Sequence, residues 1–162
     1  MVKRVVKSFS LLLAFCLLLI GSVSAATMGE LPESEASLGG IGLNSTMGYV
    51  ESVYGELFDS YWTTDYFNQD SYCYRYGKGF YIYTDNGKVE ELFTNKSNGI
   101  ATPMGITVGI PMQSVFNLWG YKEPYDGIYR YSAGLGPKEV EITTKKVKGQ
   151  LLVKSILVRF GC

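Results

Sequence analysis

A short element occurs twice in this sequence, at a constant offset of 65 residues. The matched pairs are Gly40 and Gly105, Ile41 and Ile106, Met47 and Met112, Val50 and Val115, Tyr54 and Trp119, and Gly55 and Gly120. A duplicated supersecondary unit constrains the architecture before any single residue does, because each copy must bury its apolar side against something. We therefore expect two tandem repeats, residues 39–97 and 98–162.

Each copy carries apolar residues at helical spacing. In the first copy they are Met47, Val50, Val53 and Tyr54, and in the second they are Met112, Val115, Phe116 and Trp119. Ser45 or Thr46 can cap the first helix, Pro111 suits the first turn of the second, and Gly55 and Gly120 can end them. These patterns predict one short amphipathic helix in each repeat.

Strand patterns follow each helix. The β-branched and aromatic runs are 72–76, 80–84 and 88–93 in the first copy, and 129–131, 140–145 and 151–160 in the second. Turns are expected at 77–79, 85–87 and 148–149, with Asn86-Gly87 favouring a tight hairpin. Alternation sets Tyr72, Tyr74 and Tyr76 on one face of the sheet, with Cys73 and Arg75 opposite. The predicted class is α+β, with each repeat a short helical segment packed on a three- to four-stranded antiparallel sheet.

An aromatic segment between the first helix and the first strand, residues 56–70, exceeds its structural need. It is ten residues longer than its counterpart when Tyr74-Arg75-Tyr76 is aligned with Tyr129-Arg130-Tyr131. Tyrosine and tryptophan among small polar residues are typical of recognition surfaces. The candidate contact residues are Tyr61, Trp62, Tyr66 and Phe67, with Tyr125 from the shorter loop. The alternative is that Phe58, Trp62 and Phe67 seal the core.

The N-terminus has the order of a secretory signal peptide, residues 1–25. Lys3, Arg4 and Lys7 precede an apolar stretch from Phe9 to Ile20, and small residues follow. The protein is expected to be exported, to the periplasm or the extracellular space, with an uncleaved anchor as the alternative. Residues 26–38 are predicted to be a disordered leader, because they combine glutamates, glycine and proline with few apolar residues.

Charge and hydropathy restrict the partners. Without residues 1–25 the chain has twelve basic and fifteen acidic residues, a net charge of −3. Such a chain has no electrostatic reason to bind nucleic acid, which requires clustered lysine and arginine. We expect no membrane span after signal cleavage, and the partner to be another extracytoplasmic protein.

The residue types that support catalysis are scarce. The chain has no histidine, which removes the usual general base and zinc ligand. Glu90 and Glu91 should point to opposite faces of a strand, while Glu139 and Glu141 share a face at an expected solvated edge. We therefore predict no catalytic residue, no metal site and no cofactor. Cys73 and Cys162 can form a disulfide in an oxidising compartment or stay as two free thiols.

The order of helix, three strands and Asn-Gly-Lys-Val resembles a known family of small repeats. It is similar to the superfamily of the β-lactamase inhibitory protein and the SmpA/OmlA-type outer-membrane assembly lipoproteins. The residues that carry the resemblance are Met47, Val50, Tyr54, Gly55, Asn86, Gly87, Lys88 and Val89 in the first copy, and Gly109, Met112, Val115, Trp119, Gly120, Glu123 and Pro124 in the second. The resemblance implies tandem copies that form one sheet surface for gripping another protein.

The function expected from these patterns is that of an exported, non-enzymatic protein-binding module of the tandem inhibitory-protein type. A structural factor in envelope assembly is the alternative, and a hydrolase is a third. Cys16 is preceded by Leu13-Ala14-Phe15, where a lipoprotein signal requires a small residue beside the cysteine. This departure from the lipoprotein branch weakens the case for a membrane tether.

Overall fold

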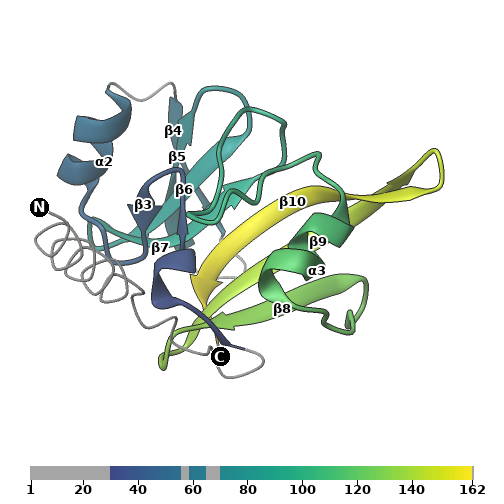
Figure 1. Ribbon diagram of the computed structural model, residues 1–162. Coiled ribbons are helices and arrows are strands. Elements are labelled where there is room, and N and C mark those ends of the chain that lie inside the picture. Colours follow the sequence, from purple (N-terminus) through teal and green to yellow (C-terminus); the bar gives the residue numbers. More distant parts are fainter. Residues whose placement is uncertain (1–29, 56–58, 65–69, 162) are drawn as a thin grey trace, which may run out of the picture.

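The computed structural model describes residues 30–55, 59–64 and 70–161. In these residues the fold is mixed α+β and is dominated by one eight-stranded sheet with two α-helices (Figure 1). The order of strands in the sheet is β1-β8-β9-β10-β7-β6-β5-β4. The fold class predicted from the sequence is therefore confirmed at the level of α+β.

The elements have the following bounds. The helices are α2 (Met47–Tyr54) and α3 (Met112–Trp119), and a 3₁₀ turn, η1, covers Glu33–Glu35. The first strands are β1 (Glu30–Leu31), β2 (Ser37–Leu38), β3 (Ile41–Gly42), β4 (Asp59–Thr64) and β5 (Asp70–Tyr76). The later strands are β6 (Phe80–Asp85), β7 (Lys88–Thr94), β8 (Ile128–Ala133), β9 (Lys138–Val147) and β10 (Gln150–Phe160). Strands β2 and β3 form a separate two-stranded sheet.

Both helices form where the apolar spacing predicts them. The hydroxyl of Thr46 accepts a hydrogen bond from the Tyr49 N–H at 3.3 Å and so caps α2. Gly55 and Gly120 follow the two helices with φ angles of 74° and 85°, a region that strains residues with a Cβ. Neither helix in the described residues has the length and hydropathy needed to cross a membrane.

The predicted apolar stripe of α2 is only partly buried. Val50 is fully buried, but Val53 is 46% exposed. Helix α3 buries three residues, Met112, Val115 and Trp119, whereas α2 buries only Val50. Successive residues of a helix lie 100° apart around its axis. Val53, six positions after Met47, therefore points away from the side of the helix that carries Met47 and Val50. Val53 is therefore a wrong member of the predicted stripe.

The strands form two antiparallel meanders. One runs β5-β6-β7 and the other β8-β9-β10, each joined by short turns. The turns Asn86-Gly87 and Lys148-Gly149 both have two successive positive φ angles, as tight hairpins require. The turn and hairpin predictions are confirmed, and each strand extends the predicted range by at most a few residues.

The last strands of the two meanders join them into one sheet. Strand β7 pairs with β10 in antiparallel register, with Leu92 opposite Val158 and Glu91 opposite Arg159. Leu92 and Val158 are fully buried and belong to the same core cluster as Val50 and Val115. Both helices therefore contribute to one core on one face of the sheet. We call this the core face and the opposite side the outer face.

Residues 30–38, which the sequence predicts as part of a disordered leader, are ordered against the sheet. Strand β1 pairs in parallel with β8, with Glu30 opposite Ser132 and Leu31 opposite Ala133. Leu31 and Leu38 are buried in the core. Two short strands with a leucine each are too brief for a periodic pattern, so composition alone favours disorder here.

A buried carboxyl group anchors this segment. Glu35 is fully buried, and its Oε1 accepts a hydrogen bond from the Met104 N–H at 2.9 Å. Its Oε2 has no partner of good hydrogen-bond geometry among the described residues. Burial raises the pKa of Glu35, although the nearby Thr102 hydroxyl, Met104 N–H and Trp119 indole act to lower it. The neutral acid is therefore favoured in the folded state more than in the unfolded chain.

Truncation of the buried valines should destabilise the fold in proportion to their burial. We expect Val50→Ala and Val115→Ala each to reduce the free energy of unfolding by about 2 kcal/mol, because each leaves a cavity. Val53→Ala is the matched control on α2 and should change it by less than about 0.5 kcal/mol. Urea unfolding followed by circular dichroism measures all three. Equal losses at Val50 and Val53 would contradict the assignment of the buried side of α2.

The two glutamates of η1 should shift the pH dependence of stability in opposite senses. The raised pKa of Glu35 implies that its contribution is fully present below its unfolded pKa of about 4.5 and is lost as the pH rises through the folded value. Glu33 pairs with Lys138, and this hydrogen bond lowers the pKa of Glu33. Its contribution is present above about pH 4.5 and is lost as the pH falls.

Matched glutamine variants separate these two effects. Relative to the unmodified protein, Glu35→Gln should gain stability as the pH rises above about 4.5. Glu33→Gln should lose relative stability as the pH rises towards about 4.5 and then stay constant. Urea unfolding at a series of pH values provides the measurement. A flat difference for Glu35→Gln would show that its carboxyl group titrates normally in the fold.

Candidate functional site

The aromatic segment contains a strand and not only a loop. Residues 56–70 were expected to connect α2 to β5 without regular structure, but Asp59–Thr64 forms β4, the terminal strand of the sheet. Strand β4 pairs with β5 in antiparallel register, with Asp59 opposite Arg75 and Trp62 opposite Tyr72. Tyrosine, tryptophan and threonine suit strands, and an ion pair of 3.0 Å joins Asp59 to Arg75 at one end.

The strand geometry separates the two central candidate residues. Tyr61 and Trp62 are neighbours in β4, so their side chains point to opposite faces of the sheet. Tyr61 lies opposite Cys73 on the outer face and is 41% exposed. Trp62 lies opposite Tyr72 on the core face, beyond the part of it that is covered, and is 73% exposed. The alternative that Trp62 seals the core is therefore wrong.

Trp62 is held by a ladder of aromatic rings. Its ring lies 5.0 Å from that of Tyr72 in an edge-to-face arrangement, and Tyr72 lies 5.0 Å from Tyr74 in the same manner. The Tyr72 hydroxyl is hydrogen bonded to Ser60 Oγ at 3.0 Å. Burial raises the pKa of Tyr74, and the charges of Tyr72 and then of Glu51 on α2 raise it further. The ladder thus runs from the sheet edge towards an acidic residue of α2.

Tyr61 takes part in a different cluster on the outer face. Its hydrogen bond with the Cys73 thiol, together with burial, raises the pKa of Tyr61 to about 12. Cys73 is a free thiol, is fully buried, and has its pKa raised by that burial. A protonated buried thiol is a poor nucleophile, so this cluster packs the outer face and does not supply reactive sulfur. Cys162 lies outside the described residues.

Tyr125 does not lie near β4. It belongs to the tight turn before β8, where its N–H donates a hydrogen bond to Ile128 O at 3.0 Å. Six strand-to-strand steps separate β8 from β4, which corresponds to roughly 29 Å at the usual spacing of about 4.8 Å. Tyr125 is 74% exposed, and the Arg130 guanidinium lies 5.9 Å from its ring centroid. The two other candidates, Tyr66 and Phe67, lie outside the described residues.

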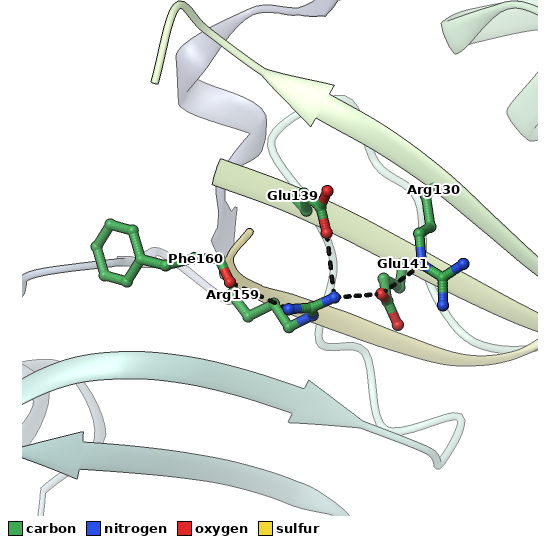
Figure 2. A network of polar contacts seen from close by, with 5 residues as sticks. All are labelled: Arg130, Glu139, Glu141, Arg159 and Phe160. Carbon is green, nitrogen blue, oxygen red and sulfur yellow. Dashed lines mark hydrogen bonds and ion pairs between the residues drawn. The ribbon is translucent and has the colours of Figure 1, made fainter. Parts of the chain in front are cut away.

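A network of charged groups crosses the outer face at the other half of the sheet (Figure 2). Arg159 Nη2 lies 2.8 Å from Glu141 Oε1 and 3.1 Å from Glu139 Oε2. Arg130 Nε donates to the same Glu141 oxygen at 2.8 Å, and Arg159 Nη1 donates to the Phe160 carbonyl at 3.2 Å. The two glutamates share a face as the sequence predicts.

The expected position of these glutamates at a solvated edge is wrong. Strand β9 lies between β8 and β10, inside the sheet, and the Glu141 side chain is only 4% exposed. Two guanidinium groups therefore compensate a buried carboxylate, as buried charges require. Because a β-strand pattern of alternating apolar and polar residues reads the same at an edge and in the centre, the sequence did not distinguish the two positions.

These ion pairs join β8, β9 and β10 on the outer face. Both arginines contact the same oxygen of Glu141, so the charge of this carboxylate is compensated within the sheet. In the described residues no group of three or more cysteine, aspartate or glutamate side chains is arranged to hold a metal ion. Of the predicted contact residues that the structure describes, Trp62 and Tyr61 on β4 and Tyr125 before β8 are exposed, as are Tyr49 and Tyr121 elsewhere on the surface.

Comparisons with known proteins provide no closer assignment. No protein-family model matches the chain, and no curated protein or solved structure is significantly similar to it. The resemblance to the tandem inhibitory-protein superfamily therefore stays a prediction from the sequence.

Removal of the buried carboxylate should destabilise the charged network. We expect Glu141→Gln to reduce the free energy of unfolding by about 3 kcal/mol, because two guanidinium groups lose their shared negative charge. Glu139→Gln, on the same strand and face, should cost about 1 kcal/mol, since its side chain is 26% exposed and contacts only one of the two arginines. Chemical denaturation measures both variants. Equal effects would contradict the central place of Glu141.

Proposed function

We propose that this protein is an exported, non-enzymatic protein-binding module whose partner contacts the β4 end of the sheet. The observation that carries the proposal is Trp62, which is 73% exposed on the terminal strand and is fixed by its contact with Tyr72. A rigid exposed tryptophan loses little conformational freedom on binding and buries a large apolar area. It has the properties of an anchor residue in a protein interface.

The surroundings of Trp62 suit such an interface. Tyr61 presents a second exposed aromatic side chain on the other side of the same strand. Glu51 is an exposed carboxylate near the Tyr74 end of the aromatic ladder, and Asp59, which is ion-paired with Arg75, is exposed on the outer face of β4 three residues before Trp62. An aromatic centre with a polar rim is the usual composition of a protein-binding surface. The partner would bury Trp62 and meet a mildly acidic border.

We also propose that the fold is a tandem of two copies of one unit, each a helix followed by a three-stranded meander. The 65-residue matches support this, because matched residues have similar surroundings. Val50 and Val115 are fully buried in one core, and Gly40 and Gly105 have φ angles of 81° and 86°.

Matched aromatic contacts add to this support. The ring of Tyr54, at the end of α2, lies 5.4 Å from that of Tyr76, and the ring of Trp119, at the end of α3, lies 5.1 Å from that of Tyr131. Tyr76 and Tyr131 end the two Tyr-Arg-Tyr motifs. In this view the first unit gains its fourth strand from β4 and the second gains a short one from β1.

The proposed contact residue can be tested with a variant at each end of the sheet. A photo-reactive residue at Thr63, introduced in the cells that make the protein, would identify the partner. Isothermal titration with that partner should then show that Trp62→Ala raises Kd by roughly 30-fold or more, the effect of losing an interface anchor. Tyr125→Ala, about as exposed but next to β8, six strand-to-strand steps from β4, should change Kd by less than roughly threefold.

The Tyr125 variant also defines the outcomes that would contradict the proposed contact site. Circular dichroism should first show that both variants are folded. An unchanged Kd for Trp62→Ala with a large loss for Tyr125→Ala would place the contact at the opposite edge and contradict the proposal. An unchanged Kd in both would contradict the use of these aromatic residues altogether.

A further inference from the structure

The hairpin of β9 and β10 extends past the rest of the sheet (Figure 1). Towards the turn of this hairpin, Val153 is the last β10 residue with two backbone hydrogen bonds to another segment. Its carbonyl accepts from the Gly109 N–H and its N–H donates to Ile110 O, both at 2.9 Å. A single bridge between Pro111 and Leu152 follows. Beyond it the hairpin pairs only with itself in the part of the chain that the structure describes. We call residues 145–152 the hairpin arm.

The arm is a regular two-stranded ribbon. Lys145, Lys146 and Val147 pair with Leu152, Leu151 and Gln150. The turn between them has φ angles of 49° at Lys148 and 84° at Gly149, the geometry of a tight two-residue hairpin. The end of the arm is therefore fixed in shape.

The arm carries only positive charge. Lys145, Lys146 and Lys148 are all exposed at its end, Lys154 is exposed at its base, and residues 142–161 contain no acidic side chain. None of these four lysines forms an ion pair within the described ranges 30–55, 59–64 and 70–161. The positive charge of the arm is a local feature, because the sequence from residue 26 onwards has a net charge of −3.

An apolar side chain lies among these lysines. Val147 is 41% exposed at the end of the arm; alternation places Lys145 on the same face of the ribbon and Lys146 on the other, and Lys148 follows in the turn. An exposed apolar side chain close to several lysine ammonium groups complements a bilayer surface, where acyl chains lie just beneath anionic phosphates.

We propose that the hairpin arm binds the surface of an anionic lipid bilayer. Val147 would enter the headgroup region while Lys145, Lys146 and Lys148 contact lipid phosphates. The arm is convex, and residues 145–150 are far fewer than the 20–30 residues that a standard protein interface takes from each side. A flat charged surface therefore fits the end of the arm better than a protein does. This peripheral contact goes beyond the proposed function and does not depend on Trp62.

The geometry predicts which lysines matter most. Strands advance about 3.4 Å per residue, so Lys145 and Lys146 lie within roughly 10 Å of the turn, about the screening distance of physiological salt. Lys154 lies several residues farther back on β10 and should contribute less. One lysine near an anionic surface contributes about 1 kcal/mol, which is roughly fivefold in affinity.

The test compares two triple variants of equal charge. The full chain is mixed with vesicles of phosphatidylcholine alone or with roughly one-third phosphatidylglycerol, and binding is measured by sedimentation. The anionic preference is the ratio of the two affinities, which cancels insertion by the apolar N-terminal segment. Replacing Lys145, Lys146 and Lys148 together by glutamine should reduce this ratio by on the order of a hundredfold. The control replaces Lys78, Lys88 and Lys96, which are exposed elsewhere, and should retain most of it.

A second variant detects insertion directly. Val147→Trp should show a blue shift of tryptophan fluorescence on anionic vesicles, after subtraction of the unmodified protein. Equal losses in the two triple variants, or no loss in either, would overturn the proposal. So would tight binding to soluble polyglutamate without any blue shift on vesicles, because that result would assign the arm to an acidic protein.

Discussion

The antiparallel pairing of β7 with β10 is the constraint on which the rest of the structure depends. Each meander has three strands, and each of the two helices has eight residues, which is too short to persist in water without burial. By placing Leu92 opposite Val158, this pairing joins the two apolar faces into one core. Burial of one continuous face then stabilises helices whose sequences alone are marginal.

The same pairing determines what happens on the outer face. Because side chains alternate along a strand, aligning Leu92 with Val158 sets Glu91 opposite Arg159. Arg159 is 5% exposed, and its guanidinium contacts Glu139 and Glu141. The register that completes the core thus also buries charges, and these charges are compensated by partners on neighbouring strands. A shift of one residue would remove both the apolar match and the ion pairs.

Local patterns predicted the local parts of this fold, and non-local pairing limited the rest. The helices, the Asn86-Gly87 turn and the two meanders follow from spacing within about ten residues. Strand β4 was missed because its run of aromatic and small polar residues was interpreted as a recognition loop, although its partner β5 is the next strand in the chain. The ordered residues 30–38 were missed because β1 pairs with the distant strand β8 and each of two short strands buries one leucine. For the candidate site, the sequence identified exposed aromatic residues but grouped Tyr125 with Trp62. Only the strand order, which places five strands between β8 and β4, separates them.

The position of Trp62 is difficult to explain by stability alone. A terminal strand exposes unpaired backbone groups, and natural proteins usually protect such edges with charged residues or with short strands. Strand β4 has a charge at Asp59 but presents Tyr61 and Trp62 in its centre. Because 73% of Trp62 is exposed, the fold gains little from its burial, while the exposed ring adds a risk of self-association. The exposed ring of Trp62 is therefore the feature on which the proposed protein contact rests.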